Sequence, residues 1–427
     1  MRTRRAILSL TALALAGLLT GSPAEARPAV AVTEAKAAER HAVLLISIDG
    51  LMPDAVLNAD SHGLGIPTLR AMLAEGGHAR VINVNPTVTN PNHTTLVTGV
   101  PPREHGIYNN RPFEAAATLP KSYSLYAQIK APTLWGAAKA AGLKTGSLFW
   151  PVTGQAGDID FNLTDGDDED DRKIADDAIA LIERERPELL TVHFVSLDHR
   201  QHETGPLSTE ARAALERIDT AIGRVVAAQR KAHPDTVIAI VSDHGFFRVT
   251  HQMNLNAALA EGGFIVLNAE KAVASWRAFA WYVGGSAMIV LRDPKDARTK
   301  ARVKAYLRGL AADPANGIEG IHDGGEIASL GLSPDAAFVV AFRPGYRMGN
   351  AMTGPLVKDD TGGAHGAFST RTLRPDMRST FLIAGPGIAA VRDLGTIDMR
   401  RIAPTLAGEL RVDLPSAALP PLRLRDR

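Results

Sequence analysis

The chain has 427 residues, 45% of them hydrophobic, and its 47 basic and 46 acidic residues give a formal net charge of only +1. Such a balance provides no electrostatic footprint for nucleic acid and no basic tail for a membrane surface. The chain contains no cysteine, so disulfides are excluded and any metal site must be built from His and carboxylate side chains.

Residues 1–26 have the features of a secretion signal. Three arginines among the first five residues precede an apolar stretch at 6–19, and Ala24-Glu25-Ala26 offers a small-x-small cleavage site. The apolar stretch is too short to span a bilayer comfortably, which favours a removed leader over a membrane anchor. We therefore expect a periplasmic or secreted protein. The pair Arg4-Arg5 is a weak twin-arginine signal, so the general secretory route is favoured.

Residues 27–40, rich in Ala and charge, are expected to form a loose leader to the fold. Three later segments then share one design, a short apolar run that ends in Asp. Runs without alternation of apolar and polar residues are typical of strands buried on both faces. The three predicted strands cover residues 41–49, 189–198 and 236–243.

Helical patterns lie between these strands, with apolar residues spaced three and four apart. They cover residues 67–75, 134–141, 176–186 and 209–232. Strands that alternate with helices predict an α/β fold with a mostly parallel, doubly wound sheet flanked by helices.

A long segment, residues 246–345, lacks the strand-Asp pattern. We interpret it as an inserted cap over the site. The core would then consist of residues 41–245 and 346–427, in keeping with one large domain that carries an insertion.

The Asp residues at the strand ends predict a site. Ligands of doubly wound sheets bind at the carboxyl ends of the strands, so three such Asp side chains would face one crevice. A single Asp there is usually a turn or cap residue, but three in one sheet favour a shared site. Together with nearby histidines they form a set of six candidate ligands: Asp49, Asp198, His202, Asp243, His244 and His365.

Six such ligands are enough for two divalent metals with open positions. Imidazole combined with carboxylate suits zinc better than magnesium or calcium, because it mixes nitrogen with oxygen donors. Two metals about 4 Å apart stabilise both the attacking and the leaving oxygen of a phosphoryl displacement.

The nucleophile of such a reaction is expected in the segment 85–99, where turn residues lead into an apolar helix start. A hydroxyl at a helix N-terminus lies beside N–H groups that favour a phosphoryl anion. Four residues fit this description, and each could instead be a helix N-cap. They are Thr87, Thr89, Thr94 and Thr95.

An ordered set of motifs then carries a resemblance to a known family. In chain order the motifs are Ile48-Asp49-Gly50, Thr89-x-Pro91-Asn92-His93 with Leu96-Val97-Thr98-Gly99, His105-Gly106-Ile107 running to Asn110, Pro132-Thr133-Leu134-Trp135, Phe149-Trp150-Pro151, Asp198-x-x-x-His202, Gly205-Pro206, Ser242-Asp243-His244-Gly245, Ala364-His365-Gly366, Gly385-Pro386-Gly387 and Ile402-Ala403-Pro404-Thr405. Across nearly its whole length after the leader, the chain resembles the nucleotide pyrophosphatase/phosphodiesterases of the alkaline phosphatase superfamily.

The resemblance implies an alkaline phosphatase-like fold and hydrolysis of a phosphodiester or pyrophosphate in a small molecule through a phospho-threonine intermediate. It implies that Thr89 is the nucleophile and that Asn110 donates to a phosphoryl oxygen. It further implies two zinc ions per chain. One would be held by Asp49, Asp243 and His244 beside Thr89, and the other by Asp198, His202 and His365 at the leaving oxygen.

Two departures from the family pattern bear on the substrate. Nucleotide-cleaving members usually carry a base-stacking Phe directly after the nucleophile, but this chain has Asn90, whose lack of a ring removes about 1–3 kcal/mol of stacking per base. Thr89-Asn-Pro-Asn92 and Pro101-Pro102 also resemble phosphonoacetate hydrolases, although lysines to grip that substrate are missing where they belong.

The expected substrate is therefore a diester, with little preference for adenine. Phe149, Trp150 and Tyr108 could supply an apolar wall for its second substituent, or they could be core residues. A phosphomonoesterase, a phosphonate hydrolase of the same superfamily, and a non-catalytic binding protein that retains the fold are the alternatives. The sequence leaves the oligomeric state open.

Overall fold

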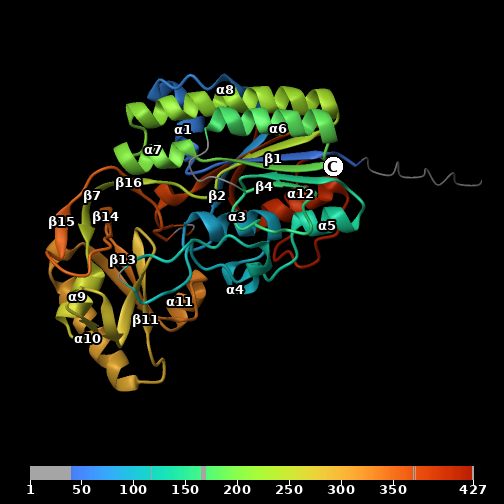
Figure 1. Ribbon diagram of the computed structural model, residues 1–427. Coiled ribbons are helices and arrows are strands. Elements are labelled where there is room, and N and C mark those ends of the chain that lie inside the picture. The colour runs from blue at the N-terminus through green and yellow to red at the C-terminus, as the bar shows by residue number, and fades with distance from the viewer. Residues whose placement is uncertain (1–39, 117, 165–169, 369, 371, 426–427) are drawn as a thin grey trace, which may run out of the picture. The chain divides into compact units, whose positions relative to one another are not determined.

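The computed structural model describes residues 40–116, 118–164, 170–368, 370 and 372–425, which form a single compact unit. The predicted secretion signal and nearly all of the predicted leader lie outside these residues. The central feature of the fold is a sheet of eight strands (Figure 1). In spatial order the strands are β18 (Arg392–Asp398), β2 (Gly77–Ile82), β17 (Ser379–Ala384), β6 (Val237–Val241), β1 (Val43–Ile48), β5 (Leu189–Phe194), β3 (Thr145–Leu148) and β4 (Phe161–Leu163).

The pairing in this sheet is parallel except at β17, which runs antiparallel to both β2 and β6. The three strands predicted from the apolar runs are β1, β5 and β6, and they lie next to one another at the centre, with every residue buried. A strand covered on both faces has no solvent side, which explains why these runs show no alternation. The predicted mostly parallel α/β sheet is confirmed.

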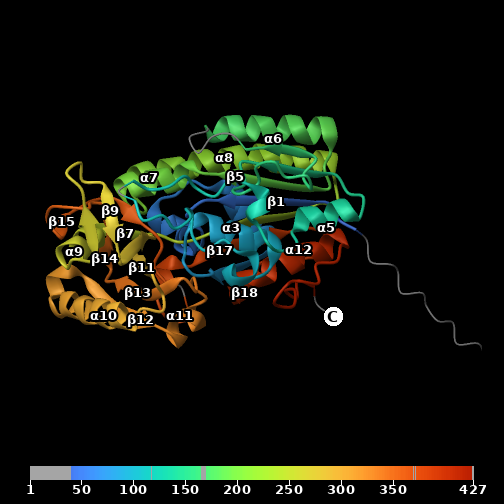
Figure 2. The same ribbon diagram turned by 60° about the horizontal axis from the view of Figure 1, so that its bottom comes forward.

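Helices cover both faces of the sheet (Figures 1 and 2). On one face, apolar side chains of the sheet pack against α1 (Pro53–Leu57), α2 (Pro67–Glu75), α6 (Asp171–Glu185) and α8 (Thr209–Ala232). On the other face they pack against α3 (Thr89–Thr98), α5 (Leu134–Ala140) and α12 (Ile402–Leu410).

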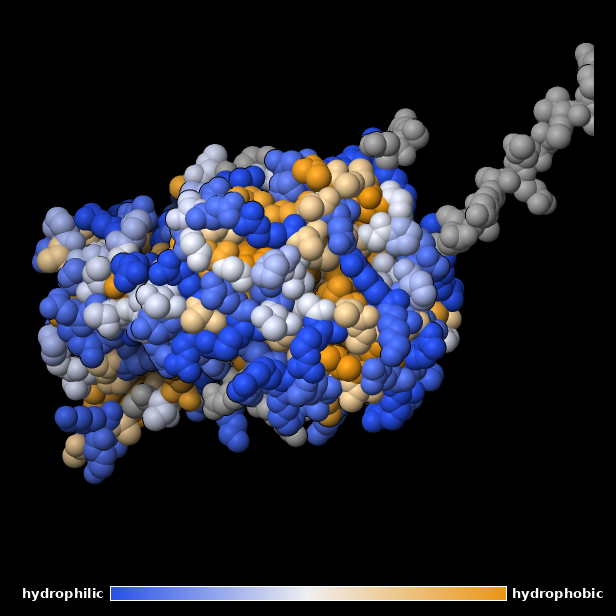
Figure 3. Space-filling model, turned by 90° about the horizontal axis from the view of Figure 1, so that it is seen from above, coloured by the Kyte–Doolittle hydropathy of each residue, from blue (hydrophilic) through white to orange (hydrophobic). Residues whose placement is uncertain are grey.

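Helices α6 and α8 each bury one side and expose the other to solvent, which explains why the spacing of apolar residues predicted them. In α8 the buried residues recur three and four positions apart, and the Ser208 side chain caps the helix by accepting from the Ala211 N–H. Figure 3 shows the molecule from above, with hydrophilic residues over most of this face and hydrophobic ones gathered in smaller patches. No helix among the described residues is long and apolar enough to cross a membrane.

Residues 247–364 build further sheets beside the central one. An antiparallel sheet contains β10 (Ala278–Tyr282), β11 (Ser286–Leu291), β13 (Ala336–Phe342) and β12 (Ile318–Asp323). Another joins β7 (Phe247–Met253) to β14 (Gly345–Met348), β15 (Val357–Asp359) and β16 (Gly363–Ala364), and a hairpin pairs β8 (Ile265–Leu267) with β9 (Val273–Trp276). Helices α9 (Leu255–Glu261), α10 (Ala297–Ala312) and α11 (Gly325–Leu330) accompany them.

The remaining elements are short. They are α4 (Pro102–His105), α7 (Ser196–Thr204) and the 3₁₀ turns η1 (Ala59–His62), η2 (Tyr126–Gln128), η3 (Pro314–Asn316), η4 (Pro375–Met377) and η5 (Met399–Arg401). Of these, α7 follows β5 directly and lies at the carboxyl end of the central strands, where it contributes to the site.

Candidate metal centre and active site

The register of the central strands brings two carboxylates together. In β1, Ser47 pairs with Val241 of β6, so Asp49 and Asp243 both come just beyond paired strand ends. Gly50, at a positive φ of 71°, turns the chain sharply and donates its N–H to Asp243 Oδ1 at 3.1 Å. A Cβ at this position would lie 2.8 Å from a carbon of the Phe246 ring, so the turn and the packing both favour glycine. His244 Nε2 then lies 3.1 Å from Asp243 Oδ2 and 3.3 Å from Asp49 Oδ1.

The third carboxylate comes from a helix and not from a strand end. The apolar run predicted a strand through Asp198, but β5 ends at Phe194 and α7 begins at Ser196. Asp198 and His202 are therefore one helical turn apart on α7, with His202 Nε2 3.5 Å from Asp198 Oδ2. The predicted strand through Asp198 was therefore wrong, because the chain turns into α7 before it reaches this residue.

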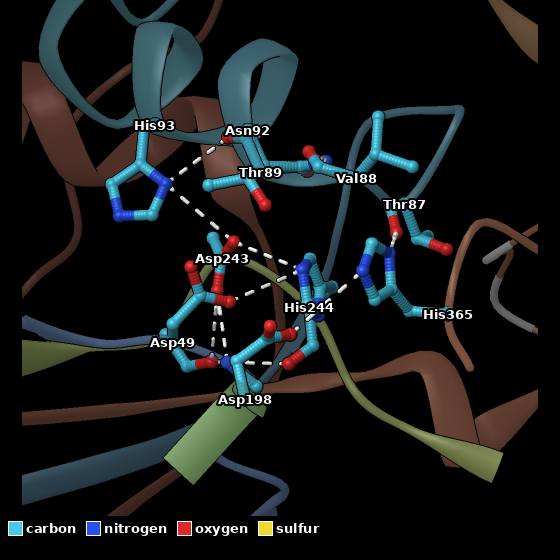
Figure 4. A network of polar contacts seen from close by, with 12 residues as sticks. Asp49, Thr87, Val88, Thr89, Asn92, His93, Asp198, Asp243, His244 and His365 are labelled. Atoms are coloured by element: carbon cyan, nitrogen blue, oxygen red, sulfur yellow. Dashed lines mark hydrogen bonds and ion pairs between the residues drawn. The ribbon is translucent and has the colours of Figure 1, made fainter. Parts of the chain in front are cut away.

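His365 follows β16 and completes the group. Its Nε2 lies 3.8 Å from Asp198 Oδ1, and its ring stacks on that of His244 with a centroid separation of 3.8 Å. All six predicted ligands are thus brought together (Figure 4, which labels five of them). His244 belongs to two groups whose possible ligand atoms lie within 4.8 Å of one another. One group consists of Asp49, Asp243 and His244, and the other of Asp198, His244 and His365. His202 lies at the edge, with a side chain 41% exposed.

The three histidines are held in one tautomer. Nδ1 of His202 donates to the Gly363 carbonyl at 3.0 Å, Nδ1 of His244 to that of Gly245 at 3.2 Å, and Nδ1 of His365 to that of Thr87 at 3.0 Å. A carbonyl oxygen can only accept, so Nδ1 carries the proton and Nε2 keeps its lone pair. Backbone partners of this kind orient the ring of a metal-ligating histidine.

Burial shapes the charge state of the site. It lowers the pKa of His244 well below its ordinary value and that of His365 to about 4, with the neighbouring imidazoles contributing to both shifts. Both rings are therefore neutral near pH 7, the form that binds metal. Burial, and next the Asp49 carboxylate, raise the pKa of Asp243 well above its ordinary value, because two like charges close together in a buried site repel each other.

The residues present fit divalent metal ions. Three buried atoms that face the group, Asp198 Oδ1, Asp243 Oδ2 and His244 Nε2, have no hydrogen-bond partner within the described part of the chain. Buried polar atoms are normally hydrogen-bonded, so their presence in one place calls for a cation. The mixture of nitrogen and oxygen donors suits zinc.

Thr89 is the first residue of α3 and is half-buried, and its side chain points toward the carboxylates (Figure 4). The other three candidate hydroxyls are buried and engaged elsewhere. Thr87 donates to the Ala367 carbonyl at 2.6 Å, Thr94 to that of Asn90 at 2.7 Å, and Thr95 to that of Val100 at 3.1 Å. Of the four threonines that local sequence could not separate, the geometry favours Thr89.

Asn110 lies close to the start of the same helix. Its Oδ1 accepts from the Asn90 backbone N–H at 2.8 Å, which leaves the Nδ2 hydrogens available as donors. The Asn90 side chain is buried against the loop that follows Asn110. Its Nδ2 contacts the carbonyl oxygens of Asn110 and Tyr123, at 3.1 and 3.2 Å, and Ser122 Oγ at 3.2 Å. Asn90 therefore holds the loop that carries Asn110.

Two histidines behind the carboxylates were not among the predicted site residues. His193 Nε2 lies 3.0 Å from Asp49 Oδ2, and His93 Nδ1 lies 3.5 Å from Asp243 Oδ2 and 3.0 Å from the Thr89 carbonyl. Signals for both exist in the sequence. His193 is a titratable residue inside a buried central strand that otherwise carries no charge, and His93 is one helical turn after Thr89.

The aromatic residues considered as a substrate wall belong to the core. Phe149 and Trp150 are buried among the apolar residues on the two faces of the sheet, and Tyr108 packs against a separate cluster around β11 and β13. A cavity of about 500 Å³ beside His202 and His365 is lined instead by Phe279, Trp281 and Tyr282 of β10, among others. Sequence reasoning missed these residues, because they lie in the segment without readable motifs.

Comparisons with known proteins agree with the motifs. A family model described as type I phosphodiesterase / nucleotide pyrophosphatase matches residues 43–367. Human ectonucleotide pyrophosphatase/phosphodiesterase family member 1 is 28% identical over 230 residues, which cover 48% of this chain and 24% of that protein. Family member 3 of Rattus norvegicus is 30% identical over 220 residues, with the same two coverages. The chain thus spans only about a quarter of the length of these two relatives.

A solved structure shows the same fold. Murine ectonucleotide pyrophosphatase / phosphodiesterase 5, an inactive variant in complex with AMP, aligns with a TM-score of 0.69 and 20% identity, over 90% of this chain and 97% of that chain. At this identity the likeness concerns the fold alone. It confirms the alkaline phosphatase-like fold class that the motifs implied.

Proposed function

The chain belongs to the type I phosphodiesterase / nucleotide pyrophosphatase family, and we propose that it hydrolyses phosphodiester or pyrophosphate bonds through a phospho-threonine intermediate on Thr89. One observation carries the proposal. The Thr89 hydroxyl, at the N-terminus of a ten-residue helix, points at a group of carboxylates and neutral imidazoles whose buried atoms need a cation. A nucleophile, an anion-binding helix end and metal ligands in one place are what phosphoryl transfer requires.

Two zinc ions per chain fit the ligands. Asp49, Asp243 and His244 would hold the ion beside Thr89, and Asp198, His202 and His365 would hold the other. His244 is close enough to both sets for the two ions to be neighbours. When bound, the ions supply Lewis-acid stabilisation of the attacking and leaving oxygens and lower the pKa of the Thr89 hydroxyl.

The Thr89 hydroxyl gives up its proton to solvent water, Oγ attacks the phosphorus atom, and the bond from phosphorus to the ester oxygen breaks. The ester oxygen departs with the bonding electron pair and takes a proton from water. A second water then hydrolyses the phospho-threonine and restores the hydroxyl. At the start of α3 the N–H groups of Asn90 and Asn92 already donate to Asn110 Oδ1 and to the Val88 carbonyl, and Pro91 has none. The Thr89 N–H is therefore the backbone donor that would face the phosphoryl oxygens during both steps.

Asn110 donates from Nδ2 to a non-bridging phosphoryl oxygen. The donor is neutral, which suits the single negative charge of a diester better than the two charges of a monoester. Because Asn90 fixes the other side of the Asn110 amide, the donor is oriented before the substrate arrives, and an oriented donor needs no reorganisation during the reaction.

We further propose that the protein is exported, to the periplasm or beyond, by its first 26 residues, and that residues 246–345 cap the core formed by 41–245 and 346–427. The partner is a small-molecule substrate. The cavity beside His202 and His365 lies between core residues 109–116 and 118–120 on one side and β10 on the other, where a cap would be expected to contact that substrate.

The test compares one preparation on a nitrophenyl phosphodiester, a nitrophenyl monoester and phosphonoacetate, with metal content measured alongside. The diester should have the highest kcat/KM. Thr89→Ala should keep two zinc ions and lose at least about 10³-fold in kcat. Thr209→Ala is the matched control, since Thr209 is the first residue of α8 and exposed. This variant should keep the zinc content and the kcat of the wild type. A faster monoester, or a Thr89→Ala variant with near-normal turnover, contradicts the proposal.

A further inference from the structure

The cavity of about 500 Å³ lies on one particular side of the metal centre. Of the six proposed ligands, His202 and His365 line it and the other four do not. Asn110, which is not a ligand, lines it as well. The cavity is therefore continuous with the ligand set assigned to the leaving oxygen, and not with the set beside Thr89. Its volume is within the range of small-molecule sites.

The walls of the cavity are mostly apolar. They come from residues 109–116 and 118–120, from β10 and from residues 348–352. The apolar residues that line it include Pro112, Leu119, Phe279, Trp281, Met348 and Met352.

The loop and the strand that form these walls are fastened to each other. The Phe113 ring stands edge-on to that of Trp281, with centroids 5.8 Å apart. Trp281 Nε1 donates to the Arg111 carbonyl at 3.1 Å, and Asn109 Nδ2 donates to the Tyr282 carbonyl at 2.8 Å. The cavity is therefore formed before a ligand enters, which lowers the entropic cost of binding.

The charge of the lining is balanced. Arg111 contributes one positive charge and Glu114 one negative charge to the lining. The side-chain amides of Asn109 and Asn256 are already used to hold carbonyl oxygens of β10. A nucleotide or pyrophosphate leaving group carries several negative charges and would need a surplus of cations. Outside the metal ligands, the described lining provides no such surplus.

We propose that this cavity receives the alcohol leaving group of the substrate and that this group is uncharged and largely apolar, such as an aryl or alkyl alcohol. The inference rests on the proposed phosphodiester hydrolysis and narrows it. The preferred bond is an ester of an apolar alcohol and not a phosphoanhydride.

Leu119 allows a charge-swap test. It lines the cavity and is 44% exposed, so a charged residue there should be tolerated by the fold. Leu163 is the matched control, because it is 45% exposed on β4 and does not line the cavity. Both leucines are replaced by Asp and by Lys.

The substrates are methyl 4-nitrophenyl phosphate and the same diester with a carboxylate added to the leaving nitrophenol. The wild type should prefer the uncharged leaving group. The ratio of kcat/KM for the charged over the uncharged substrate should be about tenfold higher in Leu119→Lys than in Leu119→Asp, by direct charge attraction and repulsion. The Leu163 variants should keep the wild-type ratio. If Leu119 had a purely structural role, replacing it by Asp and by Lys would not move the ratio in opposite directions.

A further diester carries the carboxylate on the retained substituent. If the charge effect follows that substituent, or if the four variants share one ratio, the leaving-group inference is overturned while diester hydrolysis stands. A wild type that prefers ATP over the uncharged diester also overturns it. A wild type that cleaves no diester refutes the proposed function itself.

Discussion

Replacing Asn90 by Ala should weaken both the fold and the active site. The Asn90 side chain is buried and donates to the carbonyl oxygens of Asn110 and Tyr123 and to Ser122 Oγ. The substitution keeps the Asn90 backbone N–H that holds Asn110 Oδ1, but it frees the backbone on both sides of the Asn110–Tyr123 loop.

The size of the effect follows from these bonds. An amide nitrogen has two hydrogens, so at most two of the three contacts are strong at once. At about 0.5–1.5 kcal/mol for each bond, Asn90→Ala should lower the free energy of unfolding by about 1–3 kcal/mol. A loosened Asn110 should lower kcat/KM for a diester by about tenfold, which corresponds to about 1.4 kcal/mol.

Urea unfolding and steady-state kinetics measure both quantities. Asn316→Ala is the control, because Asn316 is buried in the segment 246–345 and donates to the Leu310 carbonyl at 2.9 Å, so it should cost stability without changing kcat/KM. In an Asn110→Ala background, Asn90→Ala should have little further effect on kcat/KM. Full additivity of the two losses would refute the idea that Asn90 acts through Asn110.

Three further predictions concern histidines and metal. His193→Phe removes the contact with Asp49 Oδ2 and should weaken zinc binding by about 10–100-fold, measured by competition with a chelator. His233 is a half-buried histidine away from the site, so His233→Phe should leave the zinc affinity unchanged. Equal zinc affinities of the two variants would exclude a positioning role for His193. Burial lowers the pKa of His105 to about 3, so between about pH 6.5 and 3 the unfolded state binds a proton that the folded state does not. Its contribution to stability is fully present above about pH 6.5 and is lost as the pH falls toward 3, at up to about 1.4 kcal/mol per pH unit. His105→Asn should therefore show a smaller loss of urea midpoint between pH 7 and pH 5, and an unchanged slope would contradict this. Removing the metal with a chelator should abolish turnover and lower the thermal unfolding midpoint, because zinc at about 1,000 times its dissociation constant stabilises the folded state by about 4 kcal/mol. Identical unfolding midpoints with and without the chelator would count against zinc binding at this site.

Much of the fold could be predicted because its signals are local. The continuous apolar runs of β1, β5 and β6 identify strands buried on both faces, and the spacing in α2 and α8 gave those helices their observed ends. The end of β5 could not be predicted, since Val195 to Leu197 remain apolar enough to extend a strand although the chain already turns into α7. The sheets of residues 247–364 depend on pairings between distant segments, which periodicity does not reveal.

The site shows the same division. The six ligands could be selected from residue types that bind metal and from the family motifs. The choice among four threonines needed the structure, because it depends on which hydroxyls already have carbonyl partners. The role of Asn90 in holding a loop, and the wall of the cavity formed by Trp281, depend on contacts across 20 and 170 positions of the chain, and no local pattern encodes them.

The proposed mechanism requires that Thr89 becomes covalently phosphorylated during turnover. Mass spectrometry of protein quenched in acid during the hydrolysis of methyl 4-nitrophenyl phosphate tests it directly. We expect a methylphosphoryl group on the peptide that contains Thr89, in an amount that rises with substrate and is missing from Thr89→Ala. Modification of Thr87, Thr94 or Thr95 instead, or steady turnover without any modified peptide, would contradict it.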